Sequence, residues 1–185
     1  MRTSVTTAVA LFAVLGLSAA GFAQDKDAPK AKAAKPKAEP PAKLPSLAEP
    51  DADGFISLFN GKDLTGWVGD TVGYKVVDGA IQCTKGKGRN LYTAHQFSDF
   101  IFRFEFLLQP GTNNGVGIRA PLTGDAAYQG MEIQIIDDND PRWAKIQPWQ
   151  KHGSIYNLVP AKTGHLKPAG QWNTEEIRAV GTKIT

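Results

Sequence analysis

The segment from Met131 to Ile135 alternates apolar and polar side chains with the two-residue period of a β-strand. Its methionine and two isoleucines point to one face, so Glu132 and Gln134 point to the other. A carboxylate and an amide on one face offer hydrogen-bonding groups, and the carboxylate can also accept a proton. The pattern therefore predicts that this strand lines a binding site.

The preceding strand-like run, 113–119, places Gly115, Gly117 and Arg119 on one face. Glycines within a strand leave the backbone bare, so another group can approach it closely. We predict that the two strands together form the floor of the binding site and that the rest of the chain supports them.

The charge of the chain is concentrated near its N-terminus. Of its 21 basic and 18 acidic side chains, residues 1–50 hold 7 and 4, which leaves 14 of each from residue 51 onward. The remainder is formally neutral, and a basic surface for nucleic acid is not indicated. We expect neither a nucleic-acid partner nor an obligate protein partner.

Residues 1–23 are typical of a secretory signal peptide, with Arg2 at the start and an apolar core at 8–17 that is too short to span a bilayer. An uncleaved anchor is the alternative, which the short apolar run disfavours. Residues 24–50 form a Lys/Ala/Pro linker that should be disordered, because it has little apolar surface to bury. We expect a secreted or periplasmic protein without a membrane span, whose folded domain covers 51–185.

Strand-like runs recur along this domain with turn residues between them, and no segment has a sustained helical period. This spacing is typical of an all-β fold, a β-sandwich or a barrel. The Asp78-Gly79 pair between two such runs predicts a hairpin with a type I′ turn. Six side chains on the apolar faces are expected to be buried: Phe100, Phe102, Phe104, Met131, Ile133 and Ile135.

Six segments, in a consistent order, carry a resemblance to a known family. They are SLFNGKDLTGW (57–67), YKVVDGAI (74–81), NNGVGIRAP (113–121), YQGMEIQIIDD (128–138), HGSIYNLVPA (152–161) and KPAGQWNTEEIRAVGTKIT (167–185). Over about residues 55–185 the chain resembles the secreted bacterial 3-keto-disaccharide hydrolase domain, also described as a 3-keto-glucoside 1,2-lyase/hydratase. The resemblance implies an antiparallel β-sandwich, a concanavalin A-like jelly roll. In that family further strands follow the last segment, so the domain ending at Thr185 is expected to be C-terminally truncated.

The resemblance also implies a reaction. A ketone at carbon 3 of a sugar acidifies the proton on carbon 2, so a base can remove it and the resulting enolate can expel the glycosidic oxygen from carbon 1. Addition of water then completes a net hydrolysis, which makes the chain a glycoside hydrolase/lyase. Glu132 is the candidate base, His152 the second acid–base group, and Arg119 the candidate partner of the enolate oxygen.

Sugar binding needs planar hydrogen-bonding groups for vicinal hydroxyls and aromatic rings for the C–H faces. The candidates are Asn114, Tyr128, Gln134 and Trp143. The run 137–140 is rich in oxygen ligands and compatible with a divalent cation, but it is equally typical of a turn, so no cofactor is predicted from it. The alternative function is that of a non-catalytic carbohydrate-binding module of the cell envelope.

Overall fold

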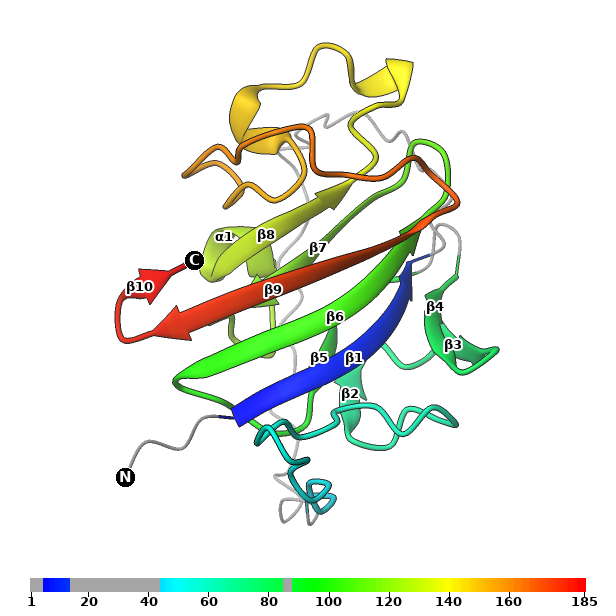
Figure 1. Cartoon of the computed structure of the whole chain (residues 1–185), viewed down its shortest axis with the longest axis vertical. Helices are drawn as coiled ribbons and strands as arrows, with labels where there is room; N and C mark the ends of the chain where they lie inside the picture. The colour runs from blue at the N-terminus through cyan, green and yellow to red at the C-terminus, as the bar shows by residue number, and fades with distance from the viewer. Residues whose placement is uncertain (1–4, 14–43, 85–87) are drawn as a thin grey trace, which may run out of the picture.

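The largest element of the computed structural model is a six-stranded sheet with the order β10-β9-β6-β1-β4-β3 (Figure 1). The structure describes the backbone of residues 5–13, 44–84 and 88–185, and the side chains of the latter two ranges. The strands of this sheet are β1 (Val5–Ala13), β3 (Tyr74–Val77), β4 (Ala80–Cys83), β6 (Phe100–Leu108), β9 (Trp172–Val180) and β10 (Lys183–Ile184). Neighbours are antiparallel except at β1, which runs parallel to both β4 and β6.

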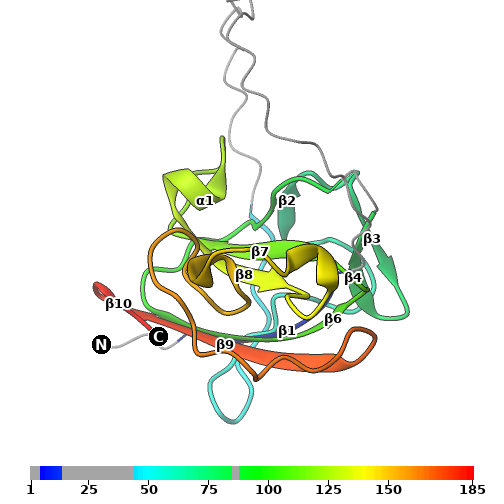
Figure 2. The same ribbon diagram turned by 90° about the horizontal axis from the view of Figure 1, so that it is seen from above.

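Two short antiparallel sheets complete the strands. One pairs β2 (Trp67–Gly69) with β5 (Leu91–Thr93), and the other pairs β7 (Asn113–Ile118) with β8 (Met131–Ile136). Figure 2 shows β7 and β8 lying over β6 and β9, with α1 (Ala126–Gln129) and β2 on the far side of the β7–β8 pair. Two 3₁₀ turns, η1 (Pro141–Trp143) and η2 (Pro148–Gln150), follow β8. The regular elements of the described residues are therefore mostly β-strands, as predicted.

The main core lies between β6 and β9 on one side and β8 on the other. Phe104, Phe106 and Ile177 belong to the same buried cluster as Ile133 and Ile135, and none of the five is more than 5% exposed. The predicted apolar faces of these strands are thus confirmed, because alternate side chains of each strand meet in one interior.

Three of the six predicted core residues are only half-buried. Phe100, Phe102 and Met131 pack against the edge of the core cluster. The two phenylalanines also line a cavity of about 400 Å³, together with Val116 and Ile118 of β7. The prediction of full burial is wrong at this end of β6 because the interior opens into that cavity.

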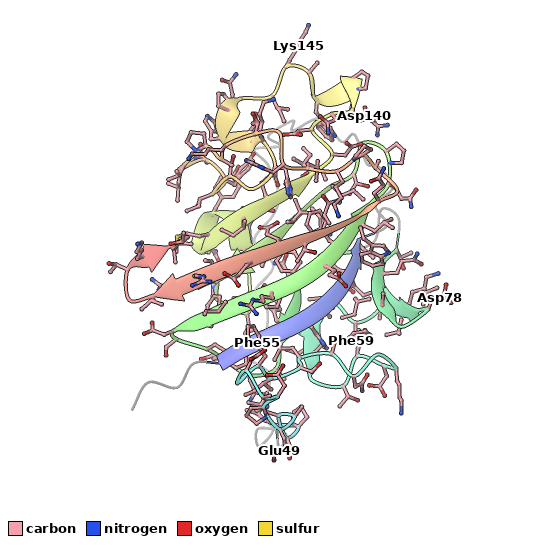
Figure 3. The ribbon with its side chains drawn as sticks, in the orientation of Figure 1. Glu49, Phe55, Phe59, Asp78, Asp140 and Lys145 are labelled. Atoms are coloured by element: carbon pink, nitrogen blue, oxygen red, sulfur yellow. The ribbon has the colours of Figure 1, made fainter. Side chains whose placement is uncertain are left out.

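The β3–β4 hairpin confirms the predicted turn. Val77 pairs with Ala80, and both intervening residues have positive φ, 50° at Asp78 and 76° at Gly79. This is the backbone that a type I′ turn needs, and aspartate and glycine tolerate it. Figure 3 shows Asp78 at the tip of the hairpin.

The N-terminal predictions fall mostly outside the described residues. Of the predicted signal peptide 1–23, the structure describes 5–13, which form β1, and of the linker 24–50 it describes 44–50, which contain no helix or strand. Cleavage after the signal peptide stays a prediction. Within the ranges 5–13, 44–84 and 88–185, no helix is long and apolar enough to cross a membrane.

Candidate active site

Glu132 lies in a row of three residues across the outer face of β8. Its partner in β7 is Gly117. On the other edge of β8 the segment around Ile155 forms a bridge with Ile133, and the Tyr156 N–H donates to the Glu132 carbonyl at 2.8 Å. Opposed residues of paired strands share a face, so Gly117, Glu132 and Tyr156 lie side by side, away from the core.

The two glycines of β7 make room for groups of the protein itself. A Cβ atom on Gly115 would lie 1.9 Å from Oε1 of Glu132, and one on Gly117 would lie 2.9 Å from the Cβ of Ala126 in α1. The Glu132 carboxyl therefore leans over β7, and α1 sits directly above the strand. The strand does need glycine at both positions, as predicted, but the space that the glycines leave is filled by Glu132 and α1.

A pocket of about 270 Å³ opens beside Glu132. Asn113 and Asn114 of β7 line it together with Arg89, Tyr92 and Asp125. This mixture of amide, guanidinium, phenol and carboxyl groups can bind several hydroxyls at once.

Asn90 joins two walls of this pocket. Its Nδ2 donates to the Gly124 carbonyl at 3.1 Å and to the Tyr92 hydroxyl at 2.9 Å. The loop before β5 is thereby tied to the loop before α1. The pocket wall is built from segments that lie 34 residues apart in the chain.

Burial raises the pKa of Glu132 to about 7, and the nearby Asp125 carboxyl adds to the rise. A carboxyl group with this pKa is partly ionised at neutral pH and is a much stronger base than an exposed glutamate. The position and the pKa of Glu132 together suit general base catalysis.

An aromatic cluster flanks Glu132 on the side away from β7. The Tyr156 ring lies edge-on to Tyr128, with centroids 6.4 Å apart, and to Trp149, with centroids 5.3 Å apart. Tyr128 is 66% exposed, and its pKa is raised first by Tyr156 and to a smaller degree by Asp125 and Glu132. Tyr128 is thus close to Glu132 on the outer face, whereas Tyr156 was not among the predicted site residues.

Gln134 shares the outer face with Glu132 but is only 3% exposed. Its Nε2 donates to the Gln150 carbonyl at 3.2 Å, and its backbone pairs with Gly153 and Ser154. The loop after η2 covers this end of β8. The prediction that Gln134 lines the binding site is wrong, since its side-chain amide is buried and supports that loop.

Arg119 does not line the Glu132 pocket. It follows the last residue of β7 and has a φ of 52°, which ends the alternation of the strand. Its guanidinium donates to the Gly181 carbonyl between β9 and β10. The expected grouping of Arg119 with Glu132 is therefore not formed, and the arginine that lines the pocket is Arg89.

His152, the predicted second acid–base group, lies on the inner side of the fold and not beside Glu132. Its ring packs on Phe106, with centroids 5.3 Å apart, and its Nε2 is 3.9 Å from Oε2 of Glu175 in β9. Burial lowers the pKa of His152 and raises that of Glu175 to about 7. The structure thus pairs His152 with Glu175, and not with Glu132.

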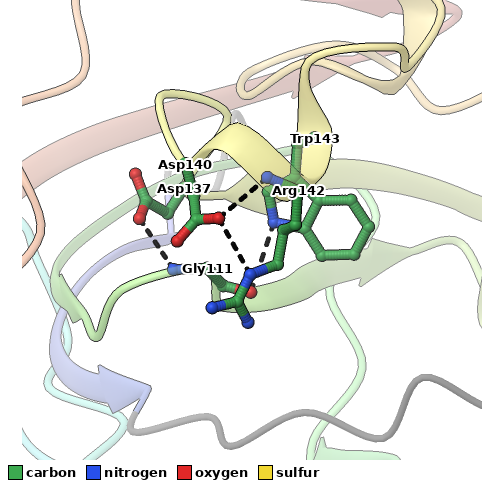
Figure 4. Close-up of polar contacts among 5 residues, drawn as sticks. All are labelled: Gly111, Asp137, Asp140, Arg142 and Trp143. Atoms are coloured by element: carbon green, nitrogen blue, oxygen red, sulfur yellow. Dashed lines mark hydrogen bonds and ion pairs between the residues drawn. The ribbon is translucent and has the colours of Figure 1, made fainter.

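Trp143 and the acidic run stabilise the turn after β8 (Figure 4). Trp143 Nε1 donates to the Gly111 carbonyl at 3.2 Å, and the Asp137 carboxyl accepts the Gly111 N–H at 2.8 Å. Asp140 accepts both the backbone N–H and the Nε of Arg142. With these hydrogen bonds the acidic run 137–140 forms a turn. No group of three metal-ligating side chains occurs in the part of the chain that the structure describes.

Comparisons with known proteins agree with this arrangement of strands. The chain is 29% identical over 163 residues to a 3-keto-disaccharide hydrolase of Bacteroides thetaiotaomicron, an alignment that covers 74% of this chain and 56% of that protein. Two crystal structures of putative glycosyl hydrolases from Parabacteroides distasonis superpose with TM-scores of 0.58 and 0.59, at 27% and 28% identity. These superpositions cover 66% and 69% of this chain, and 62% and 64% of the solved chains.

The chain thus spans 56% of the length of the curated relative and under two thirds of the two solved chains. Residues 54–185, nearly all of the predicted folded domain, match the 3-keto-alpha-glucoside-1,2-lyase-like domain. This is the family that the ordered segments indicated, and its relatives share the β-rich fold. The chain therefore belongs to the 3-keto-alpha-glucoside-1,2-lyase-like domain family.

Proposed function

We propose that this protein cleaves 3-keto-glycosides by elimination and hydration, with Glu132 as the base. The observation that carries the proposal is the placement of Glu132, a carboxyl with a pKa of about 7 on the wall of a polar pocket. A base with a pKa near the working pH combines a useful ionised fraction with good proton affinity. The family and its curated relative support the same reaction class.

The pocket supplies the other groups that the reaction needs. Arg89 and Asn113 line it with Glu132. Asn113 alternates with Gly115 and Gly117 on the face that carries Glu132, whereas Asn114 is opposed to the buried Ile135 and points to the inner face. We assign the binding of the enolate oxygen to Arg89 and Asn113, since donors aimed at a developing negative charge lower the barrier.

The reaction differs from ordinary glycoside hydrolysis in its need for carboxylates. Most glycosidases use a carboxylate pair around an oxocarbenium-like transition state. Elimination needs one base for the carbon 2 proton, and the ketone of the substrate makes that proton acidic. Glu132, a pocket carboxyl with a raised pKa, fits this requirement.

The cellular context and the complete fold belong to the same proposal. A signal peptide at 1–23 would export the protein to the periplasm or the medium, where glycosides are encountered. A closed concanavalin A-like sandwich would complete the sheets described above. The antiparallel pairing of β3 with β4, of β6 with β9 and of β7 with β8, and the similarity to glycosyl hydrolase structures, support this architecture.

The exposed aromatic cluster favours a second candidate, a carbohydrate-binding module without activity. Tyr128, which is 66% exposed, could hold a sugar ring by its C–H face. Such a module would bind oxidised and unoxidised sugars alike, because stacking does not depend on a ketone.

The test is to incubate the full-length protein with a 3-keto-disaccharide and with the same disaccharide before oxidation, and to measure released monosaccharide. Release only from the keto sugar is the expected result. Binding of both sugars without release from either would contradict the proposal and support the binding module. A parallel reaction with a chelator reports whether a divalent cation is needed.

A further inference from the structure

None of the residues assigned so far can protonate the leaving group of the elimination. The departing glycosidic oxygen needs a proton, because a sugar alkoxide is a poor leaving group. His152 was the predicted second acid–base group, but it lies on the inner side of the fold beside Phe106 and Glu175. The donor must therefore come from the outer face, close to Glu132.

Tyr156 lies at that position. Its backbone N–H bonds to the carbonyl of Glu132, so the two residues are opposed across paired strands, with side chains on the same face. The Glu132 carboxyl leans toward Gly115, on the β7 side. The row across β8 thus presents a carboxyl and, next to it, a phenol.

Two groups hold the Tyr156 hydroxyl in place. Gln150 Nε2 donates to it at 3.4 Å, and Gln150 is itself held because its Oε1 accepts the Gln147 N–H at 2.9 Å. Interaction with Tyr156 is also the main cause of the raised pKa of Tyr128, and the two rings lie edge-on to each other. Donors that approach the phenol oxygen leave the proton of Tyr156 itself free to be given to a ligand.

We propose that Tyr156 is the general acid that protonates the leaving oxygen, an inference that rests on the elimination reaction proposed above. Glu132 takes the proton from carbon 2, the carbon 1–oxygen bond breaks, and the departing oxygen takes the phenolic proton of Tyr156. Water then adds to carbon 1 and returns a proton to the Tyr156 oxygen, while Glu132, whose proton has exchanged with solvent, protonates carbon 2. The sum is hydrolysis, and both side chains regain their starting states.

The layout on the outer face matches the connectivity of the substrate. Carbon 1 is bonded to carbon 2, so the acid must lie next to the base, as Tyr156 lies next to Glu132. The polar pocket on the β7 side of Glu132 takes the oxidised ring. The exposed ring of Tyr128 then faces the leaving group and provides an apolar surface for it.

The test compares Tyr156→Phe with the wild type on two substrates that differ only in leaving group. The variant keeps the ring that packs on Tyr128 and Trp149. Turnover of a 3-keto-disaccharide should fall by roughly 10²–10⁴-fold, and turnover of 4-nitrophenyl 3-keto-glucoside by less than about tenfold, because nitrophenolate leaves without a proton. Tyr128→Phe is the matched control, with a smaller loss on the disaccharide expected.

A loss of the same size on both substrates, or no loss on the disaccharide, would overturn the role of Tyr156. A wild type inactive on both keto substrates would refute the elimination reaction itself.

Discussion

Glu132 and Glu175 are both largely buried carboxyls, but Glu132 lies on the outer face of β8 and Glu175 lies in the interior, on β9. Burial is the main cause of a raised pKa in both, to about 7 in each case. Glu132 lies on the wall of the polar pocket, next to Tyr156. Glu175 is paired across the sheet with Phe104 and faces His152 in the interior.

A raised pKa alone therefore does not identify a catalytic group. Desolvation raises the pKa of any carboxyl that is taken out of water, whether or not a substrate can reach it. Only Glu132 combines the raised pKa with a pocket and hydrogen-bonding neighbours. Glu175 is therefore interpreted as a structural group that is protonated below about pH 7 and lies beside His152.

The largest expected effect separates the two glutamates by activity. Glu132→Gln keeps the shape and the hydrogen-bonding capacity of the side chain but cannot accept the carbon 2 proton. Turnover of a 3-keto-disaccharide should fall by roughly 10²–10⁴-fold with little loss of substrate binding, as measured by steady-state kinetics and calorimetry.

Glu175→Gln is the matched control for that experiment, because it makes the same chemical change on the inner face. Its turnover should stay within about threefold of the wild type, since surrounding packing is retained. Equal losses in both variants would remove the distinction between the two sites. A loss of binding that matches the loss of turnover in Glu132→Gln would favour the binding module.

The next largest effect concerns the core that surrounds Glu175. Phe104 is 2% exposed and packs between Phe102 and Phe106. Phe104→Ala should lower the free energy of unfolding by ~3–5 kcal/mol, because the cavity would not close completely. Urea denaturation monitored by circular dichroism measures this loss, and a loss below about 1 kcal/mol would show that this face of β6 is not the core.

The third effect is a pH dependence specific to Glu175. Its pKa rises from about 4.5 unfolded to about 7 folded, so its contribution to stability is complete below pH 4.5 and is lost as the pH rises through 7. At 1.36 kcal/mol per pH unit, the advantage of Glu175→Gln over the wild type should grow by about 3 kcal/mol across this window. Denaturant titrations of both proteins at each pH measure it.

A constant difference between these two proteins would contradict that interpretation. It would show that Glu175 is ionised throughout and forms an ion pair with a charged His152. His152 opposes the trend of Glu175 in the wild type, because its depressed pKa costs stability as the pH falls through its folded value. The comparison of the variant with the wild type isolates Glu175 from this effect.

The smallest expected effect comes from the neighbour of Glu175 on the other face of β9. Glu176 is bonded to Arg103 and Arg178, which lower its pKa. Glu176→Gln should lower the free energy of unfolding by less than about 1 kcal/mol, because partly exposed ion pairs contribute little. High salt should reduce the loss further, and a larger, salt-independent loss would show that the pair is not screened by water.

Local alternation predicted the parts of the fold that depend on neighbouring residues alone. The two faces of β8 follow from the run Met131 to Ile135, and the β3–β4 hairpin follows from Asp78-Gly79. In both cases the backbone period or the turn geometry is set within a few residues. The same rule does not extend to Arg119, where the strand has ended and a positive φ redirects the side chain.

Contacts between distant segments determined what the sequence did not predict. Tyr156 reaches Glu132 only because residues 153–156 pair with β8, and the loop that carries them also covers Gln134. Glu175 lies on the inner face between Asn173 and Ile177, so polar residues interrupt the apolar pattern that would have marked that face. No periodicity reports such pairings, because they depend on how loops fold back onto the sheet.

The fate of the carbon 2 hydrogen shows directly whether Glu132 acts as the base. The full-length protein is incubated with a 3-keto-disaccharide in D₂O, and the released 3-keto sugar is examined by NMR and mass spectrometry, with enzyme-free exchange subtracted. If Glu132 removes that proton, the product should carry deuterium at carbon 2, and Glu132→Gln should lose the exchange together with turnover. Enzymatic product that retains hydrogen at carbon 2, or exchange at the wild-type rate in Glu132→Gln, would contradict the account.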